Sequence, residues 1–272
     1  MITERELRRV AGRAGLGVGQ AEHEYVILCA LDALSQTRPL SETFCLKGGT
    51  ALRQLYFPDW RHSVDLDFSV LPLFPAKRLR ANLTVWFDQI ETLHGVHVSL
   101  RGLHQANGAA RVRARFVGPL RHPNRLLLDI TLDEPVLLPP GRRPVVTGLF
   151  SDPHPYVLAY ALEEILAEKL RSILQRGKAR DYYDVWRLLR EKADIFDRQA
   201  ARQVLGEKCQ HKGLPAPSVE AFLSPALLEG ASAFWSQDLI GQVPGKYLPS
   251  WDRVTADLSQ LLPAFFDGEQ RP

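Results

Sequence analysis

Several residue types are scarce in this chain, and their scarcity narrows the classes of protein that it can belong to. It has three cysteines and one methionine in 272 residues. The cysteines are widely spaced, and two of them lie in apolar surroundings, so we expect reduced core residues rather than a disulfide framework or a zinc site. No window approaches the run of about 18 apolar residues that a membrane-spanning helix needs. The charged N-terminal segment also lacks the apolar centre of a signal peptide. We therefore expect a cytoplasmic protein with no membrane partner.

Lysine is scarce as well, although the chain is weakly basic with a net charge of +3. Of the 34 basic residues, 8 are lysines, which leaves 26 arginines. The planar guanidinium of arginine suits phosphate and RNA recognition, but a GC-rich genome produces the same bias. A length of 272 residues with 45% hydrophobic residues is enough for one large domain or two ordinary ones.

Residues 43–70 show the clearest pattern in the chain, and they predict a strand, a glycine turn, a helix and a second strand. The apolar run that ends at Leu46 is followed by Gly48 and Gly49, and Thr50 then opens a helical segment that Pro58 ends. A phosphate group fits at such a helix start, because the first backbone N–H groups are unpaired and glycine allows a close approach. The alternative is an ordinary tight turn.

Two aspartates follow in the same segment. Asp65 and Asp67 are one residue apart within an apolar run, so on a strand both carboxylates project from one face. Two adjacent carboxylates favour a cation, and Mg²⁺ fits because it binds one or two carboxylates and completes its shell with water and phosphate oxygens. The joint interpretation is a site for a nucleotide and Mg²⁺, whereas a surface Asp-X-Asp pattern is the alternative.

The middle of the chain predicts helices followed by a sheet. Helical spacing covers residues 4–37, with a glycine-rich break, and 76–94, whereas residues 96–100, 111–117 and 125–132 alternate as strands. Arg111, Arg113 and Arg115 fall on one strand face, which either lines a phosphate-bearing groove or faces water. Asp129 lies among leucines, where burial without a partner would be costly. It is the natural third carboxylate of a two-metal site, unless it makes a turn bond at a strand edge.

Prolines and glycines in residues 135–155 mark a boundary. We therefore predict a first domain over residues 1–150 and a helical lobe over 151–272. A helix from Tyr156 to Gln175 places Lys169 within its apolar stripe, where the lysine either snorkels or points toward a triphosphate. A second helix places Asp181 and Asp184 on one face. The negative charge of Asp181 is favourable near the N-terminus of this helix, whereas Asp184, a turn further on, has no such explanation.

Four ordered motifs together resemble the AbiEii/AbiGii-type nucleotidyltransferase toxins of abortive-infection and type IV toxin–antitoxin systems. The motifs are Lys47-Gly48-Gly49-Thr50-Ala51-Leu52, Arg61-X-Ser63-X-Asp65-Leu66-Asp67-Phe68, Glu168-Lys169-Leu170 and Arg180-Asp181-X-Tyr183-Asp184-Val185-Trp186. The resemblance covers roughly residues 20–265. It implies an α+β fold with the mixed sheet of the DNA polymerase β-type nucleotidyltransferases, flanking helices and a helical C-terminal lobe.

The resemblance also implies roles for the motif residues. The Gly48-Gly49-Thr50 turn holds nucleotide phosphates, and Lys47 and Arg53 add charge nearby. Asp65 and Asp67 bind the metal, and Lys169 contacts the triphosphate. Asp184 completes the active site as a base or by orienting Lys169. Asp129 fits the wider superfamily better than the toxin motifs.

The implied activity is Mg²⁺-dependent transfer of a nucleoside monophosphate from an NTP to an acceptor hydroxyl. The acceptor that the resemblance favours is the 3′ end of tRNA, whose modification blocks translation. The expected partners are the NTP, the RNA acceptor and a helix-turn-helix antitoxin encoded nearby. The alternatives are a nucleotidyltransferase that modifies a protein or small molecule, and a non-catalytic nucleotide or RNA-binding module on the same fold.

Overall fold

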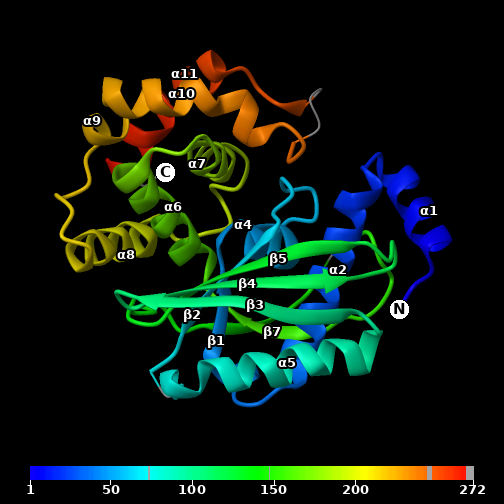
Figure 1. The fold of residues 1–272 in the computed structure, drawn as a ribbon. Helices are drawn as coiled ribbons and strands as arrows, with labels where there is room; N and C mark the ends of the chain where they lie inside the picture. Colours follow the sequence, from blue (N-terminus) through cyan, green and yellow to red (C-terminus); the bar gives the residue numbers. More distant parts are fainter. Residues whose placement is uncertain (73, 147, 244–246, 268–272) are drawn as a thin grey trace. The chain divides into compact units, whose positions relative to one another are not determined.

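The computed structural model describes residues 1–72, 74–146, 148–243 and 247–267. By its internal contacts the chain divides into two compact units, Met1–Tyr160 and Ala161–Pro272. The first unit holds a β-sheet with helices, and the elements of the second unit are helices (Figure 1). This division falls ten residues later than the boundary at residue 150 that the prolines predict.

The first unit begins with two helices, α1 (Glu4–Ala14) and α2 (Val18–Gln36). Thr3 and Glu6 form a capping box at the start of α1, since each side chain accepts a hydrogen bond from the other residue's backbone N–H. Gly15 ends α1 with a left-handed backbone at a φ of 66°, which glycine adopts without steric cost. The predicted helical pattern with a glycine-rich break is confirmed.

A seven-stranded sheet forms the centre of the first unit, in the order β3-β4-β5-β2-β1-β7-β6. Its strands are β1 (Phe44–Lys47), β2 (Asp65–Val70), β3 (His97–Ala106), β4 (Ala109–Val117), β5 (Pro123–Thr131), β6 (Gly141–Pro144) and β7 (Tyr156–Ala159). Strand β2 pairs antiparallel with β1 and parallel with β5, so the sheet is mixed. Together with the flanking helices, it confirms the predicted α+β fold class.

One face of the sheet is apolar and is covered by α2 and α5 (Leu79–His94). The ring of Phe68 lies 6.0 Å from that of Trp86 on α5, and the indole N–H of Trp86 donates to the carbonyl oxygen of Ala30 on α2 at 2.8 Å. Burial of a side chain such as Phe68 contributes roughly 1.5–3 kcal/mol. Because strand side chains alternate, the polar residues of β2, β4 and β5 lie on the opposite face.

The segment between β1 and β2 begins with the predicted helix. Helix α3 (Leu40–Thr43) precedes β1, and α4 (Gly48–Ala51) follows it directly and continues as a π-helix over Leu52–Tyr56. A further short helix, η2 (Ala76–Arg78), leads into α5. The two strands and the helix predicted for residues 43–70 are therefore confirmed, but the helix begins at Gly48, two residues before the predicted start at Thr50, so the two glycines are its first residues.

The helix predicted from Tyr156 begins six residues too early. Tyr156–Ala159 form β7, which pairs in parallel with β1 and antiparallel with β6, and α6 begins only at Leu162. The backbone N–H of Tyr160 also donates to the carbonyl oxygen of Leu46 at 3.1 Å. The apolar spacing of this segment suits either a helix or a strand edge, and pairing with β1 decides the outcome.

The second unit is built from helices with a buried aromatic centre. Its helices are α6 (Leu162–Arg176), α7 (Ala179–Glu191), α8 (Arg198–His211), α9 (Val219–Phe222), α10 (Pro225–Leu239) and α11 (Trp251–Phe266). Trp235 and Trp251 have ring centroids 4.9 Å apart, which joins α10 to α11. In the described part of the chain, none of the helices has the length and apolarity to cross a bilayer.

The three cysteines are free and buried, as predicted. Burial raises the pKa of the Cys29 thiol to about 12 and also raises the pKa of Cys209. Since the thiolate is the reactive form, these residues are inert parts of the core.

Candidate active site

The glycine turn after β1 packs directly against the second aspartate of β2. Gly48 has a φ of 73°, a conformation that favours glycine. A Cβ atom at Gly48 would overlap the carboxylate of Asp67, and one at Gly49 would lie 2.8 Å from Nη2 of Arg61. Gly48 is therefore favoured by both its backbone conformation and this close approach, whereas a side chain at Gly49 would have to displace the guanidinium of Arg61. The close packing brings the first two sequence motifs into contact.

The strand register places four charged residues in a row on the polar face of the sheet. On neighbouring strands, Lys47 is opposite Asp67, Asp67 is opposite Asp129, and Asp129 is opposite Arg111. Asp65 lies two residues before Asp67 on β2 and shares its face. Since adjacent strands lie about 4.8 Å apart, the structure brings the three predicted acidic residues onto one small area of the sheet.

Asp129 is less buried than its leucine-rich surroundings predict. Its side chain is 49% exposed, and Nε of Arg111 lies 2.9 Å from its Oδ1. The neighbouring Leu128 and Ile130 point to the apolar face, whereas Asp129 points to the polar one. The expectation of a costly buried carboxylate is therefore wrong. The expected cation is present as Arg111, whose pKa is raised by its hydrogen bond to Asp129 and by the charge of that group.

Lys47, at one end of this row, is buried. Its Nζ lies 3.5 Å from Oε2 of Glu134, which is also buried, and 5.5 Å from the ring centre of Tyr160. The lysine is thus held by an acidic and an aromatic partner at the position opposite Asp67. The sequence indicated the charge of Lys47 but not Glu134, which lies in the proline-rich segment.

The side chain of Thr50 connects the start of α4 to strand β2. Its hydroxyl donates to the backbone carbonyl oxygen of Asp65 at 2.5 Å, and the residue is 1% exposed. This bond fixes α4 against β2. Thr50 therefore positions the turn, in addition to the phosphate role that the resemblance predicts for it.

The side chain of Arg53 is part of a buried hydrogen-bond network and does not lie on a surface from which it can reach a phosphate. Its Nε lies 2.6 Å from Oε1 of Glu24, and its Nη1 donates to the carbonyl oxygens of Pro58 and Trp60. Arg53 is 6% exposed. Because its donors are committed to these acceptors, we remove Arg53 from the predicted nucleotide contacts.

The centre of that network, Glu24, was missed by the sequence analysis. Glu24 is 2% exposed and accepts from Gln54 at 2.6 Å, and its Oε1 lies 2.5 Å from Nδ1 of His62. Burial acts to raise the pKa of Glu24, but the hydrogen bond from His62 and the charge of Arg53 lower it overall. Its signal in the sequence is a carboxylate directly before the apolar run of residues 25–31 in α2.

In the second unit, the structure brings the three predicted residues of α6 and α7 together. Nζ of Lys169 lies 3.1 Å from Oδ1 of Asp181 and 2.7 Å from Oδ2 of Asp184. Both aspartates have fully buried side chains, and the lysine side chain is 10% exposed. Lys169 therefore does not simply snorkel to solvent, and Asp184 has the partner that its position lacked in the sequence.

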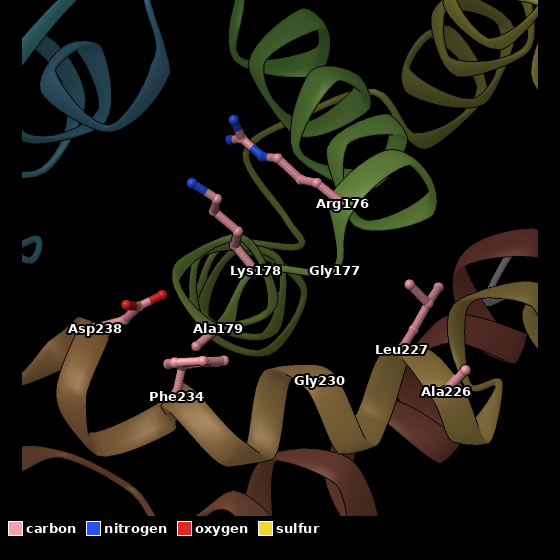
Figure 2. A pocket seen from close by; sticks show the side chains of 9 residues that line it. All are labelled: Arg176, Gly177, Lys178, Ala179, Ala226, Leu227, Gly230, Phe234 and Asp238. Carbon is pink, nitrogen blue, oxygen red and sulfur yellow. The ribbon is translucent and has the colours of Figure 1, made fainter.

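Arg176 extends this cluster toward a pocket. Its guanidinium donates to Asp181 at 2.9 Å. Burial acts to raise the pKa of Asp181, but the charges of Lys169 and Arg176 lower it overall. Arg176 also lines a pocket of about 410 Å³ between the α6–α7 turn and α10. Figure 2 shows Arg176 and Lys178 extending from that turn, with Phe234 on α10.

The polar face of β2 and β5 offers oxygen ligands of the kind that Mg²⁺ prefers. Asp65 and Asp67 share one strand face, and Asp129 adjoins Asp67 in register. Within residues 1–72, 74–146, 148–243 and 247–267, no three His, Cys, Asp or Glu side chains are grouped so that they could hold a metal ion. In this arrangement Asp129 is paired with Arg111, so its use as a metal ligand requires exchange of that partner.

Comparisons with known proteins show the family of the chain. Residues 30–257 match the family model described as nucleotidyl transferase AbiEii toxin, type IV toxin–antitoxin system, and the chain belongs to this family. It is therefore a nucleotidyltransferase toxin of a type IV toxin–antitoxin family, with an NTP substrate and an antitoxin partner. No curated protein matches the chain.

A solved structure shares the fold. MenT4, a nucleotidyltransferase toxin from Mycobacterium tuberculosis H37Rv, is similar with a TM-score of 0.68 and 19% sequence identity. The match covers 99% of this chain and 91% of MenT4. At this identity the likeness shows that the two chains share a fold.

Proposed function

We propose that this toxin transfers a nucleoside monophosphate from an NTP to a hydroxyl at the 3′ end of tRNA, with Mg²⁺ as the cofactor, and so blocks translation. The observation that carries the proposal is the contact of Gly48 with the carboxylate of Asp67. It joins a turn suited to phosphate with a carboxylate pair suited to Mg²⁺, and a triphosphate bound as its magnesium complex needs both.

In the proposed reaction, the acceptor hydroxyl oxygen bonds to the α-phosphorus of the NTP and loses its proton. The bond from that phosphorus to the bridging oxygen breaks, and pyrophosphate leaves with the electron pair. Asp65 and Asp67 would hold Mg²⁺, which neutralises phosphate charge when bound. The backbone N–H groups of Gly48, Gly49 and Thr50 would hold the phosphates, with the buried charge of Lys47 close by.

The proposal keeps Lys169 as a contributor to nucleotide binding, as the resemblance implies. The fully buried Asp184, whose Oδ2 lies 2.7 Å from Nζ of Lys169, suits a positioning role better than that of a base. A carboxylate held in this ion pair keeps the ammonium in one orientation. Asp181, three residues earlier on the same face of α7, lies 3.1 Å from the same ammonium.

The acceptor is tested by incubating the purified toxin with each α-labelled NTP and either total tRNA or protein alone. The proposal predicts that label enters tRNA, that chelation with EDTA stops the transfer, and that added Mg²⁺ restores it. Label in protein alone would assign a protein acceptor instead. If none of the four NTPs releases pyrophosphate with either acceptor, the chain is a non-catalytic nucleotide or RNA-binding module.

A further inference from the structure

Strand β4 carries a ladder of arginines on the polar face of the sheet. Arg111, Arg113 and Arg115 are exposed and alternate with residues buried on the other face. Strands β3, β4 and β5 lie side by side in Figure 1. On β5, Arg125 lies directly opposite Arg115, and Asp129 lies opposite Arg111. The arginines therefore share a face with the acidic residues of the candidate active site.

The pairing of Arg115 with Arg125 is unfavourable for the isolated protein. Like charges directly opposite each other across two strands are destabilising, whereas opposite charges stabilise such pairs. In the described part of the chain, Arg113, Arg115 and Arg125 have no acidic partner, while Arg111 is paired with Asp129. An anionic ligand on this face would remove the repulsion and supply the missing partners.

A glycine on the neighbouring strand makes room for one of these guanidinium groups. Gly102 on β3 is opposite Arg113 on β4. A Cβ atom at Gly102 would lie 3.4 Å from Nε and 3.6 Å from Nη2 of Arg113, so the guanidinium lies over the glycine. The register shifts between Leu100 and Gly102, which inserts the exposed Arg101 beside this position.

We propose that Arg113, Arg115 and Arg125, here called the arginine patch, bind the phosphate backbone of the RNA acceptor. The inference rests on the proposed function. Arg113 and Arg115 are two residues apart, so their attachment points are about 6.8 Å apart along the strand. A regular row of guanidinium groups suits a polymer of phosphates, because each group can bind two oxygens of one phosphate.

The position of the arginine patch favours RNA over an acidic partner protein. The patch continues along β4 and β5 to Arg111 and Asp129, which is opposite Asp67. An acceptor whose 3′ end reaches the carboxylates has its preceding phosphates nearby, and these need cations. Such contacts to the backbone position a nucleic acid without reading its sequence.

The test measures binding of fluorescein-labelled total tRNA to the full chain without NTP. For the double variant Arg113→Glu/Arg115→Glu, we expect the affinity for tRNA to fall by about tenfold or more. The plot of the logarithm of the binding constant against the logarithm of the salt concentration should also become less steep, its negative slope shrinking in magnitude by about two. The matched control is Arg80→Glu. Arg80 is exposed and lies on α5, the helix that packs on the apolar face of the sheet. This control should change neither value.

A second measurement separates lost binding from lost folding. Arg115→Glu converts the pair with Arg125 into one of opposite charge, so its thermal midpoint should equal or exceed that of the wild type. Its KM for tRNA should rise while its KM for NTP stays unchanged. Unchanged tRNA affinity in both variants overturns the inference. If the two variants lose antitoxin binding but keep full tRNA binding, the inference is also overturned and the patch is assigned to a protein partner.

The two proposals fail in distinguishable ways, because the binding assay needs no catalysis. A wild type that binds tRNA through the arginine patch but transfers no nucleotide contradicts only the proposed function. A wild type that modifies tRNA, and whose patch variants keep the same KM for tRNA, contradicts only the inference.

Discussion

Gly48 lies against the carboxylate of Asp67, so closely that a Cβ atom would overlap it. The two residues are 19 positions apart in the sequence, Gly48 at the start of α4 and Asp67 on β2, yet they form the junction between the proposed phosphate turn and the proposed metal-binding strand. The position of one therefore determines the position of the other.

Gly48→Ala should reduce nucleotide transfer sharply. The new methyl group must displace Asp67, and a misplacement of about 1 Å in an active site can cost about 10²-fold in rate. The left-handed backbone adds a strain of roughly 1–2 kcal/mol. Transfer of labelled NTP into tRNA measures the effect. Gly12→Ala is the control, because an added Cβ meets no atom within 4 Å there and the residue lies in α1.

Lys169→Met should abolish transfer by the folded protein, and Lys208→Met is its matched control. Lys208 is also buried and lies 2.8 Å from Glu164 and 3.1 Å from Glu168, so each variant removes a lysine shared by two acids. Removal of one partner from a buried ion pair costs about 3–5 kcal/mol, so both melting temperatures should fall. Activity per folded molecule, measured well below both midpoints, should be lost only in Lys169→Met. Equal activities in the two variants would limit Lys169 to a structural role.

Glu24→Gln should weaken the fold and flatten its acid dependence. The pKa of Glu24 is lowered in the folded state, so its contribution is present above the unfolded pKa of about 4.3 and is lost as the pH falls through the folded value. At pH 7 the variant leaves Arg53 without its buried counter-ion, which costs about 3–5 kcal/mol. Urea unfolding at several pH values between 3 and 7 measures both effects.

Glu4→Gln provides the comparison for that experiment. Glu4 pairs with Arg8 on the surface of α1, where the side chains are 49% and 59% exposed. An exposed pair of this kind contributes about 0–1 kcal/mol. If Glu24→Gln lost stability below pH 4 as steeply as the wild type, the acid dependence would arise elsewhere, for example at Asp181, whose pKa is also lowered.

Arg111→Ala should reduce the Mg²⁺ concentration that gives half-maximal activity. Without Arg111 the carboxylate of Asp129 loses its ion-pair partner and can bind Mg²⁺ together with Asp67, which is opposite it on β2. An exposed ion pair is worth about 1 kcal/mol at most, so the expected change is no more than about fivefold and the melting temperature should stay the same. An unchanged Mg²⁺ requirement would make Asp129 a surface partner of Arg111 alone.

Much of the first unit could be predicted from the sequence, because local patterns determine it. The period-two alternation around Asp65 and Asp67 gave β2 its two faces, and Gly48-Gly49 marked the turn. The side-chain contacts could not be predicted in this way. Arg53 carries the same charge whether it faces a phosphate or Glu24, and only the packing of α2 against the turn distinguishes the two. The burial of Asp129 was misjudged for a related reason, since its leucine neighbours alternate away from it.

The error at Tyr156–Ala159 has a different origin. A short apolar run fits a helix or a strand, and the choice depends on a partner strand more than a hundred residues earlier. The signal for Glu24 was present but unused, as an acidic residue directly before the apolar run of residues 25–31 in α2. Arg113 and Arg115 of the arginine patch were visible in a periodic row with Arg111, but their relation to Asp67 depends on the order of β4, β5 and β2 in the sheet.

The most direct test of the account is nucleotide transfer by Asp67→Asn at increasing Mg²⁺ concentrations. Asparagine has nearly the same size as aspartate and should leave the contact with Gly48 and the melting temperature unchanged, while it removes the charge that the cation needs. We predict that the folded variant transfers no labelled nucleotide to tRNA and no longer inhibits growth. Full transfer by Asp67→Asn at the wild-type Mg²⁺ concentration would contradict the assignment of this residue as a metal ligand.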